Sequence, residues 1–198
     1  MLLKINQKPD HGFDEPLGLL SDCHRRIEHF LAVLVSITDQ VRGGALTTAE
    51  RGQLEGALTY FATAGPRHTA DEEESLFPRL EAAKRRDREV ADAIELVWNL
   101  EHDHAEANGH HVVVDTIVRR WLNAGTLSGT DVKELEIRLS RLGALYRMHI
   151  EAEDRELFPA AARILSAREI EEIGAEMAAR RLGFSRTALG QSRAAAKL

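Results

Sequence analysis

The sequence predicts an all-α protein, an antiparallel up-down four-helix bundle with a short extra helix near its C-terminal end. Only 5 prolines and 14 glycines occur in 198 residues, and Leu, Ala, Glu and Arg are the dominant residues. Apolar residues recur every three or four positions over long segments, and no segment of any length alternates polar and apolar residues as a strand does. Long helices joined by short glycine-containing turns pack as an antiparallel bundle.

The first helix is predicted to begin at Pro16, because proline suits the first turn of a helix, where its missing N–H needs no partner. The Gly43-Gly44 pair ends this helix. Between these points one helical face repeats every three or four positions. Its residues are Leu17, Leu20, His24, Ile27, Leu31 and Leu34.

The second helical segment is predicted over residues 49–84, with Thr47 or Thr48 as its N-terminal cap. Pro66 is expected to kink or restart it, because proline removes a backbone hydrogen-bond donor. The third segment is predicted over residues 88–123, and a glycine-containing turn ends it.

The fourth helical segment is predicted over residues 131–164, with Ser128 or Thr130 as its cap. A fifth, shorter helix is predicted over residues 167–181, and Ser166 can cap it. The remaining residues to the C-terminus have little apolar periodicity and are expected to be loose.

The helices group into one domain, because no shift in composition divides the chain. Residues 1–15 are predicted to form an N-terminal arm, residues 16–164 the four-helix bundle, and residues 165–198 the C-terminal helix and loose tail. A chain of 198 residues is long enough for a single domain with a sizeable core.

The composition excludes several classes of partner. The formal net charge is -6 and there is no basic block, so the surface that neutralises nucleic-acid phosphates is missing. No apolar run reaches the length of a signal peptide or a membrane span. The single cysteine, Cys23, rules out an internal disulfide and suits a reducing compartment. We therefore expect a cytoplasmic monomer or homodimer that binds neither nucleic acid nor membrane.

The most informative feature is a repeat. The stretch "RHTADEEESLFPRL", residues 67–80, returns as "MHIEAEDRELFPAA", residues 148–161, and we call these the first and second copies. His149 follows His68 by 81 residues, and Glu153 follows Glu72 by the same interval. Leu-Phe-Pro ends the shared pattern in both copies.

The His/Glu pair of each copy has the spacing of a metal half-site. Residues four apart lie one turn apart on one helix face, about 5–6 Å between β-carbons. An imidazole and a carboxylate there can bind one metal, or the carboxylate can bridge to a second metal. A repeat kept only for packing has no need to preserve two buried polar residues, which are costly without partners. The pattern therefore predicts that His68, Glu72, His149 and Glu153 are metal ligands.

A further histidine precedes each copy. His24 faces the core in the first half, 44 residues before His68. In the second half the candidates are His102, His104, His110 and His111. His104 is favoured, because Leu100 and Val97 precede it as Leu20 and Leu17 precede His24. His104 also precedes His149 by 45 residues, whereas His102 precedes it by 47. His102 stays open as the alternative, and Glu101 or His111 can add a ligand or a supporting hydrogen bond.

Neighbouring residues are given less specific roles. Three acids are predicted to be solvated charges, because their helical phase points away from the His/Glu face: Glu73, Glu74 and Asp154. Cys23 lies about 100° around the helix from His24 and is interpreted as a packing residue. Tyr60 and Tyr146 are interpreted as core or metal-adjacent residues, with Tyr146 able to hydrogen-bond near the metal. Pro78 and Pro159 are predicted to bend or end the ligand helices.

These residues resemble the hemerythrin-like, or HHE cation-binding, family. Its pattern is a lone His, then His-x-x-x-Glu with a trailing Leu-Phe-Pro, then both elements again. Here the pattern reads His24, His68/Glu72, His104 (or His102) and His149/Glu153, within about residues 17–161. The resemblance implies a four-helix bundle around two non-haem iron ions with an oxo or hydroxo bridge, which the two glutamates also bridge. Iron, rather than manganese or zinc, rests on this resemblance.

One departure from the family bears on function. Oxygen-carrying hemerythrins have five histidines, the fifth one turn after the third-helix ligand. Here Asn108 stands four residues after His104, and Glu106 four after His102, so a fifth histidine is not evident. This departure weakens a simple oxygen-carrier assignment.

The resemblance leaves more than one function class open. The leading hypothesis is a di-iron protein that binds or senses dioxygen, nitric oxide or iron. The alternative is a di-iron redox enzyme acting on peroxide or nitric oxide in stress defence, with Tyr146, Glu101 or His111 available for electron or proton delivery. A structural metal bundle or iron store is the third hypothesis.

Overall fold

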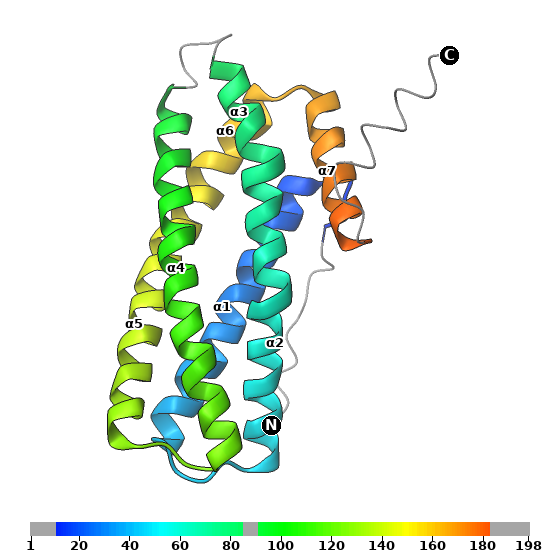
Figure 1. Cartoon of the computed structure of the whole chain (residues 1–198). Coiled ribbons are helices and arrows are strands. Elements are labelled where there is room, and N and C mark those ends of the chain that lie inside the picture. The colour runs from blue at the N-terminus through cyan, green and yellow to red at the C-terminus, as the bar shows by residue number, and fades with distance from the viewer. Residues whose placement is uncertain (1–10, 85–90, 183–198) are drawn as a thin grey trace.

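The computed structural model describes residues 11–84 and 91–182, and within these ranges the chain is helical and has no strand. Four antiparallel rods form an up-down bundle, as predicted (Figure 1). Two rods change from α-helix to π-helix and back, and the π-helical segments are labelled η. In chain order the helices are α1 Pro16–Val41, α2 Thr48–Asp71, η1 Glu72–Leu76, α3 Phe77–Lys84, α4 Ala91–Ala124, α5 Gly129–Ala152, η3 Glu153–Leu157, α6 Phe158–Ile164 and α7 Ala167–Arg181.

Side-chain caps fix the starts of three helices. Thr47 caps α2 in a reciprocal capping box with Glu50, and Ser166 caps α7 in the same way. Ser128 accepts a hydrogen bond from the N–H of Asp131 at the start of α5. Of the alternatives that the sequence leaves open, Thr47 and Ser128 are therefore the caps.

The two turns at one end of the bundle are tied together. The N–H of Leu127 donates to the carbonyl of Gly43, and the Trp121 indole N–H donates to the carbonyl of Gly44, both at 2.8 Å. Gly43 has a φ of 75°, and a β-carbon there would lie 2.5 Å from Val132 Cγ2. Only glycine suits this close approach between the α1–α2 and α4–α5 turns.

The buried apolar residues form two clusters along the bundle axis. One cluster lies toward the tied turns and includes Leu34, Leu54 and Trp121. The other lies toward α3 and α6 and includes Leu20 and Met177. On α1, His24 lies between Leu20 of the second cluster and Leu31 of the first. The polar residues of the repeat that contact His24 therefore lie between the two clusters.

None of the three prolines ends the helical rod in which it lies, so the predicted alternatives of ending or restarting a helix there are wrong. Pro66 lies inside α2, which continues to Asp71. Pro78 and Pro159 lie inside α3 and α6, just after η1 and η3. The N–H of Phe77 bonds to the carbonyl of Glu72, five residues back. This wider turn lets the helix continue, because the proline ring would otherwise clash with the carbonyl four residues before it.

The fifth predicted helix, α7, packs against α1, α2 and η1 at the α3–α6 end of the bundle (Figure 1). The predicted loose tail beyond residue 182, and residues 1–10 of the predicted arm, lie outside the described residues. No helix in the described ranges is long and apolar enough to cross a membrane.

Candidate metal centre

The six predicted ligands come together in the middle of the bundle. Their side-chain atoms form two four-residue groups, and within each group one ligand atom per residue lies within 4.8 Å of the others. The first metal group is His24, His68, Glu72 and Glu153. The second metal group is Glu72, His104, His149 and Glu153. Both groups share the two glutamates, whose side chains are 0% exposed.

Each glutamate approaches one imidazole of each group. Glu72 Oε1 lies 3.3 Å from His68 Nε2, and its Oε2 lies 3.3 Å from His104 Nε2. Glu153 Oε2 lies 3.0 Å from His24 Nε2 and 3.3 Å from His149 Nε2. All four histidines therefore direct the same nitrogen, Nε2, at the shared carboxylates. This is the placement that two bridging carboxylates require.

The donor set fits metal cations. All four side-chain oxygens of Glu72 and Glu153 are buried. None of them accepts a hydrogen bond of good geometry from another described residue. Two buried carboxylates whose oxygens lie within 4.8 Å of each other repel, and a cation between them removes that cost. Imidazole nitrogen with carboxylate oxygen is a ligand set that divalent transition metals accept.

Three of the four histidines are oriented by a carboxylate at their outer nitrogen. His24 Nδ1 lies 3.0 Å from Asp154 Oδ1, and His104 Nδ1 lies 2.8 Å from Glu73 Oε1. His149 Nδ1 lies 3.4 Å from Asp103 Oδ2. A carboxylate at Nδ1 favours the tautomer in which Nε2 carries the free lone pair for a metal. His68 Nδ1 is buried and has no hydrogen-bond partner among the described residues.

Comparison with known proteins agrees with this geometry. The Hemerythrin HHE cation binding domain matches residues 15–161. The chain belongs to this family. It is also 28% identical over 169 residues to an uncharacterized protein of Haemophilus influenzae, a match that covers 85% of this chain and 91% of that protein. The family match includes both copies of the repeat, and α7 lies beyond its end. Membership of the HHE family and the two His/Glu groups together indicate metal binding.

The prediction that Glu73 and Asp154 are solvated charges is wrong. The side chains of both are only about one-third exposed. Asp154 bonds to His24 of the first metal group, and Glu73 bonds to His104 of the second. The prediction assumed 100° of rotation per residue, whereas both residues lie in π-helices, whose wider turn rotates each residue less. The sequence did hold a signal, because these two acids are also 81 residues apart. Glu74, in contrast, is exposed as predicted.

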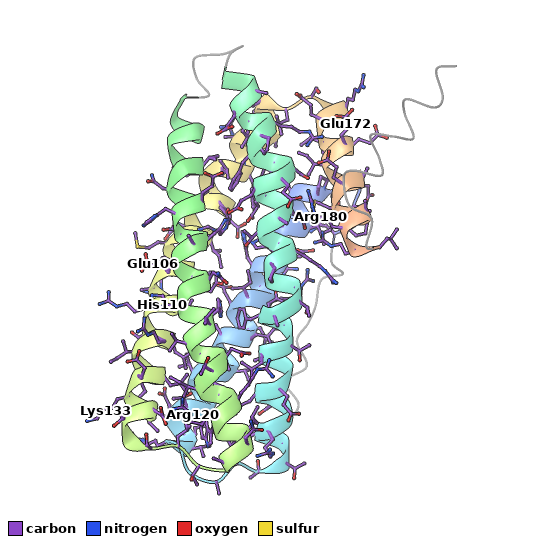
Figure 2. The ribbon with its side chains drawn as sticks, in the orientation of Figure 1. Glu106, His110, Arg120, Lys133, Glu172 and Arg180 are labelled. Carbon is purple, nitrogen blue, oxygen red and sulfur yellow. The ribbon has the colours of Figure 1, made fainter. Side chains whose placement is uncertain are left out.

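The other candidates around His104 are separated by the structure. His102 is exposed, and neither Glu101 nor His111 belongs to either metal group. His110 lies on another side of α4, where Figure 2 labels it near Glu106, and its Nδ1 is 3.2 Å from Arg138. The sequence did not indicate Asp103, because an acid between two histidines has no spacing that relates it to His149, which it contacts in the structure.

The pKa values of the predicted ligands are shifted in different directions. Burial alone would lower the pKa of His24, but contacts with Asp154 and Glu153 outweigh it and raise the pKa to about 10. Burial, reinforced by the neighbouring His24, lowers the pKa of His68 well below its usual range. Burial would raise the pKa of Glu153, but His149 and His24 hold it below its usual value. Burial and the charge of Glu153 raise the pKa of Glu72 well above its usual range.

A cavity of about 590 Å³ reaches the metal centre from the side. Its lining includes the four histidines of the metal groups, and it passes between α2 and α4 at Gly65, Thr69 and Asn108. On the other side the centre is closed by two phenylalanines of the repeat. Phe158 stacks on His24 at 5.5 Å between ring centroids, and Phe77 lies parallel to His104 at 6.3 Å.

Proposed function

We propose that this HHE-family protein holds a pair of iron ions and uses them to bind or sense dioxygen or nitric oxide. The observation that carries the proposal is that each of Glu72 and Glu153 approaches one imidazole of each metal group. Carboxylates placed between imidazoles of both groups can bridge two adjacent ions. The His/carboxylate donor set and the family resemblance support iron.

The protein groups leave room for a small ligand. Each metal group supplies two imidazoles and two shared carboxylates. A pair of iron ions with coordination positions left open would supply reversible binding of a diatomic ligand. The cavity on the α2–α4 side gives such a ligand access to the four histidines. Phe77 and Phe158 keep water from the opposite side, and the carboxylates at Nδ1 hold the rings in place.

The test is metal analysis and visible spectroscopy of the freshly purified protein. We expect iron at close to two ions per chain, and an absorption band that changes reversibly when dioxygen or nitric oxide is added and removed. His104→Ala is expected to lose metal and spectrum, while His102→Ala, at an exposed position, keeps both. Zinc or manganese in place of iron, or the opposite order of the two histidine variants, would contradict the proposal.

A second function is supported by one further contact. Tyr146 Oη and His111 Nε2 lie 2.7 Å apart and both line the same cavity. A phenol hydrogen-bonded to a neutral imidazole can pass a proton during redox chemistry, which suits an enzyme acting on peroxide or nitric oxide. Loss of hydrogen peroxide in the presence of the iron-loaded protein, slowed by Tyr146→Phe, would favour the enzyme. Peroxide that persists would favour reversible binding.

A further inference from the structure

The cavity beside the metal centre is larger than a diatomic ligand needs. A diatomic gas takes about the space of one water molecule, roughly 30 Å³. The cavity measures about 590 Å³, which lies within the range of about 300–1,000 Å³ typical of sites for organic molecules. Part of this space belongs to the metal ions of the proposed function, because the four histidines of the metal groups line it. Two ions and a diatomic ligand still fill only part of a cavity of this size, and the rest can hold an organic guest.

One part of the cavity wall is apolar and aromatic. Ile27, Ala107 and Ile150 are buried residues that contribute to its wall. Phe61 and His111 add a continuous ring surface, because their centroids are 4.3 Å apart with a tilt of 32°. Such walls suit a flat, apolar guest. Gly65 adds no side chain at the α2 side, and a β-carbon built there would meet no atom within 4 Å.

One polar pair stands in this apolar part, formed by Tyr146 and His111. Burial lowers the pKa of His111 to about 4 and raises the pKa of Tyr146, so both are uncharged at neutral pH. If the tyrosine donates to His111 Nε2, its oxygen can accept a hydrogen bond from a guest. If the imidazole donates, the tyrosine hydroxyl can donate to the guest. In either tautomer the pair can bond to a hydroxyl group.

The charges along the cavity select against ions. The lining includes Glu73 and Glu101, which disfavour an anion. The metal ions of the proposed function disfavour a cation. The aromatic wall, the neutral pair and this charge pattern together describe an uncharged molecule with a ring and a hydroxyl group.

We propose that the cavity binds an uncharged phenol-class molecule whose hydroxyl group bonds to Tyr146 and His111 and whose ring lies against Phe61. The inference deepens the proposed function, because it names a second ligand for the same metal-lined cavity. It does not depend on iron, since no atom of the guest has to coordinate a metal.

The test titrates phenol, and benzene as the matched probe without a hydroxyl, into the metal-loaded protein as purified, with binding followed by NMR. We expect phenol to bind about tenfold more tightly than benzene, the ratio that one net hydrogen bond supplies. Tyr146→Phe should remove this preference and leave benzene binding unchanged. Gly65→Leu should weaken both probes, and Ala105→Phe on the exposed rim is the second blocking variant should the first fail to fold.

Three results would overturn the inference. They are no binding of either probe, equal binding of both, and a phenol preference that survives Tyr146→Phe but disappears when a chelator removes the metal. The last would mean that phenol coordinates the metal instead. Metal content measured on the same samples separates this outcome from failure of the proposed function, since a protein without iron can still show the phenol preference.

Discussion

The two copies of the repeat share a motif and differ in their surroundings. In both, the histidine lies 3.3 Å from the glutamate four residues later, and the helix becomes π-helical at that glutamate. Yet the pKa of Glu153 is lowered, and the pKa of Glu72 is raised well above its usual range. One Glu153 oxygen approaches two imidazoles, whereas the Glu72 oxygens approach one imidazole each. Without metal, folding therefore favours the charged form of Glu153 and the uncharged form of Glu72.

The residue before each glutamate adds to this difference. Asp71 precedes Glu72, is fully buried, and its negative charge also raises the pKa of Glu72. At the matching position before Glu153 the second copy has Ala152. Asp71 in turn is paired with Arg180 at 2.7 Å and with Arg181 at 2.5 Å, both from α7. Figure 2 labels Arg180 where α7 lies against the α2–η1–α3 rod. The chain thus gives the buried acid of the first copy two cationic partners from α7, and the second copy has no acid at the matching position.

The largest effect is expected where the two copies are alike. Glu72→Ala and Glu153→Ala should each reduce bound metal to well below two ions per chain, because each carboxylate approaches ligands of both metal groups. Metal analysis of the purified variants measures this loss. A variant that still binds two ions per chain would contradict the bridging role of its glutamate.

The next largest effect is a difference in stability between variants of the two glutamates, measured on protein whose metal has been removed by a chelator. Glu153→Gln should lower the free energy of unfolding by about 3–5 kcal/mol, because it leaves His24 and His149 without their buried anion. Glu72→Gln should stay within about 1 kcal/mol of the parent, because folding already favours an uncharged Glu72. Urea unfolding at neutral pH measures both.

The pH dependence of that result follows from the lowered pKa of Glu153. A carboxylate whose pKa is lower in the folded state stabilises the fold above its unfolded pKa, near 4.5, and loses that contribution as pH falls further. The difference in free energy of unfolding between Glu153→Gln and the parent protein should therefore become smaller below pH 4.5. Equal losses for the two glutamine variants would contradict the difference between the copies.

A smaller effect is expected from α7. Arg181→Ala should cost about 1.5–3 kcal/mol in urea unfolding, because buried Asp71 loses one of its two cationic partners. The matched control is Arg155→Ala in η3, which breaks a pair with Glu151 whose side chains are 75% and 56% exposed. This control should cost about 0–1 kcal/mol. Similar losses in both variants would mean that α7 does not distinguish the first copy.

The smallest effect tests the crossed support of the histidines. Glu73→Gln and Asp154→Asn should each weaken metal binding by about 10–100-fold, measured by competition with a chelator. Glu73→Gln should affect the second metal group, because Glu73 bonds to His104, and Asp154→Asn should affect the first, because Asp154 bonds to His24. Glu74→Gln, at an exposed position beside Glu73, is the control and should leave the affinity unchanged.

Sequence patterns predicted the fold class, because the helices of this bundle have a clear apolar period and recognisable caps. They also singled out the six residues that the structure brings together, although their role as ligands remains a prediction. The constant interval between the copies made these residues visible, since it repeats the polar residues along with the apolar ones.

What the sequence could not show depends on backbone detail and on distant contacts. The π-helices turn Glu73 and Asp154 toward the centre, and no rule based on a regular helix detects that change of phase. Asp71 reads as one more acid in an acidic run, because its partners lie more than a hundred residues away. Tyr146 was recognised as a candidate near the metal, but its partner His111 follows from the register of α5 against α4.

The paired π-helices also bear on how this chain arose. A π-helical turn holds one residue more than an α-helical turn, so a single inserted residue converts one into the other. The extra residue stands at the same place in both copies, between the glutamate and Phe-Pro. Two independent insertions at one position are a less economical history than a single insertion inherited twice. The matched π-turns are therefore what duplication of a half-length unit that already held such a turn predicts.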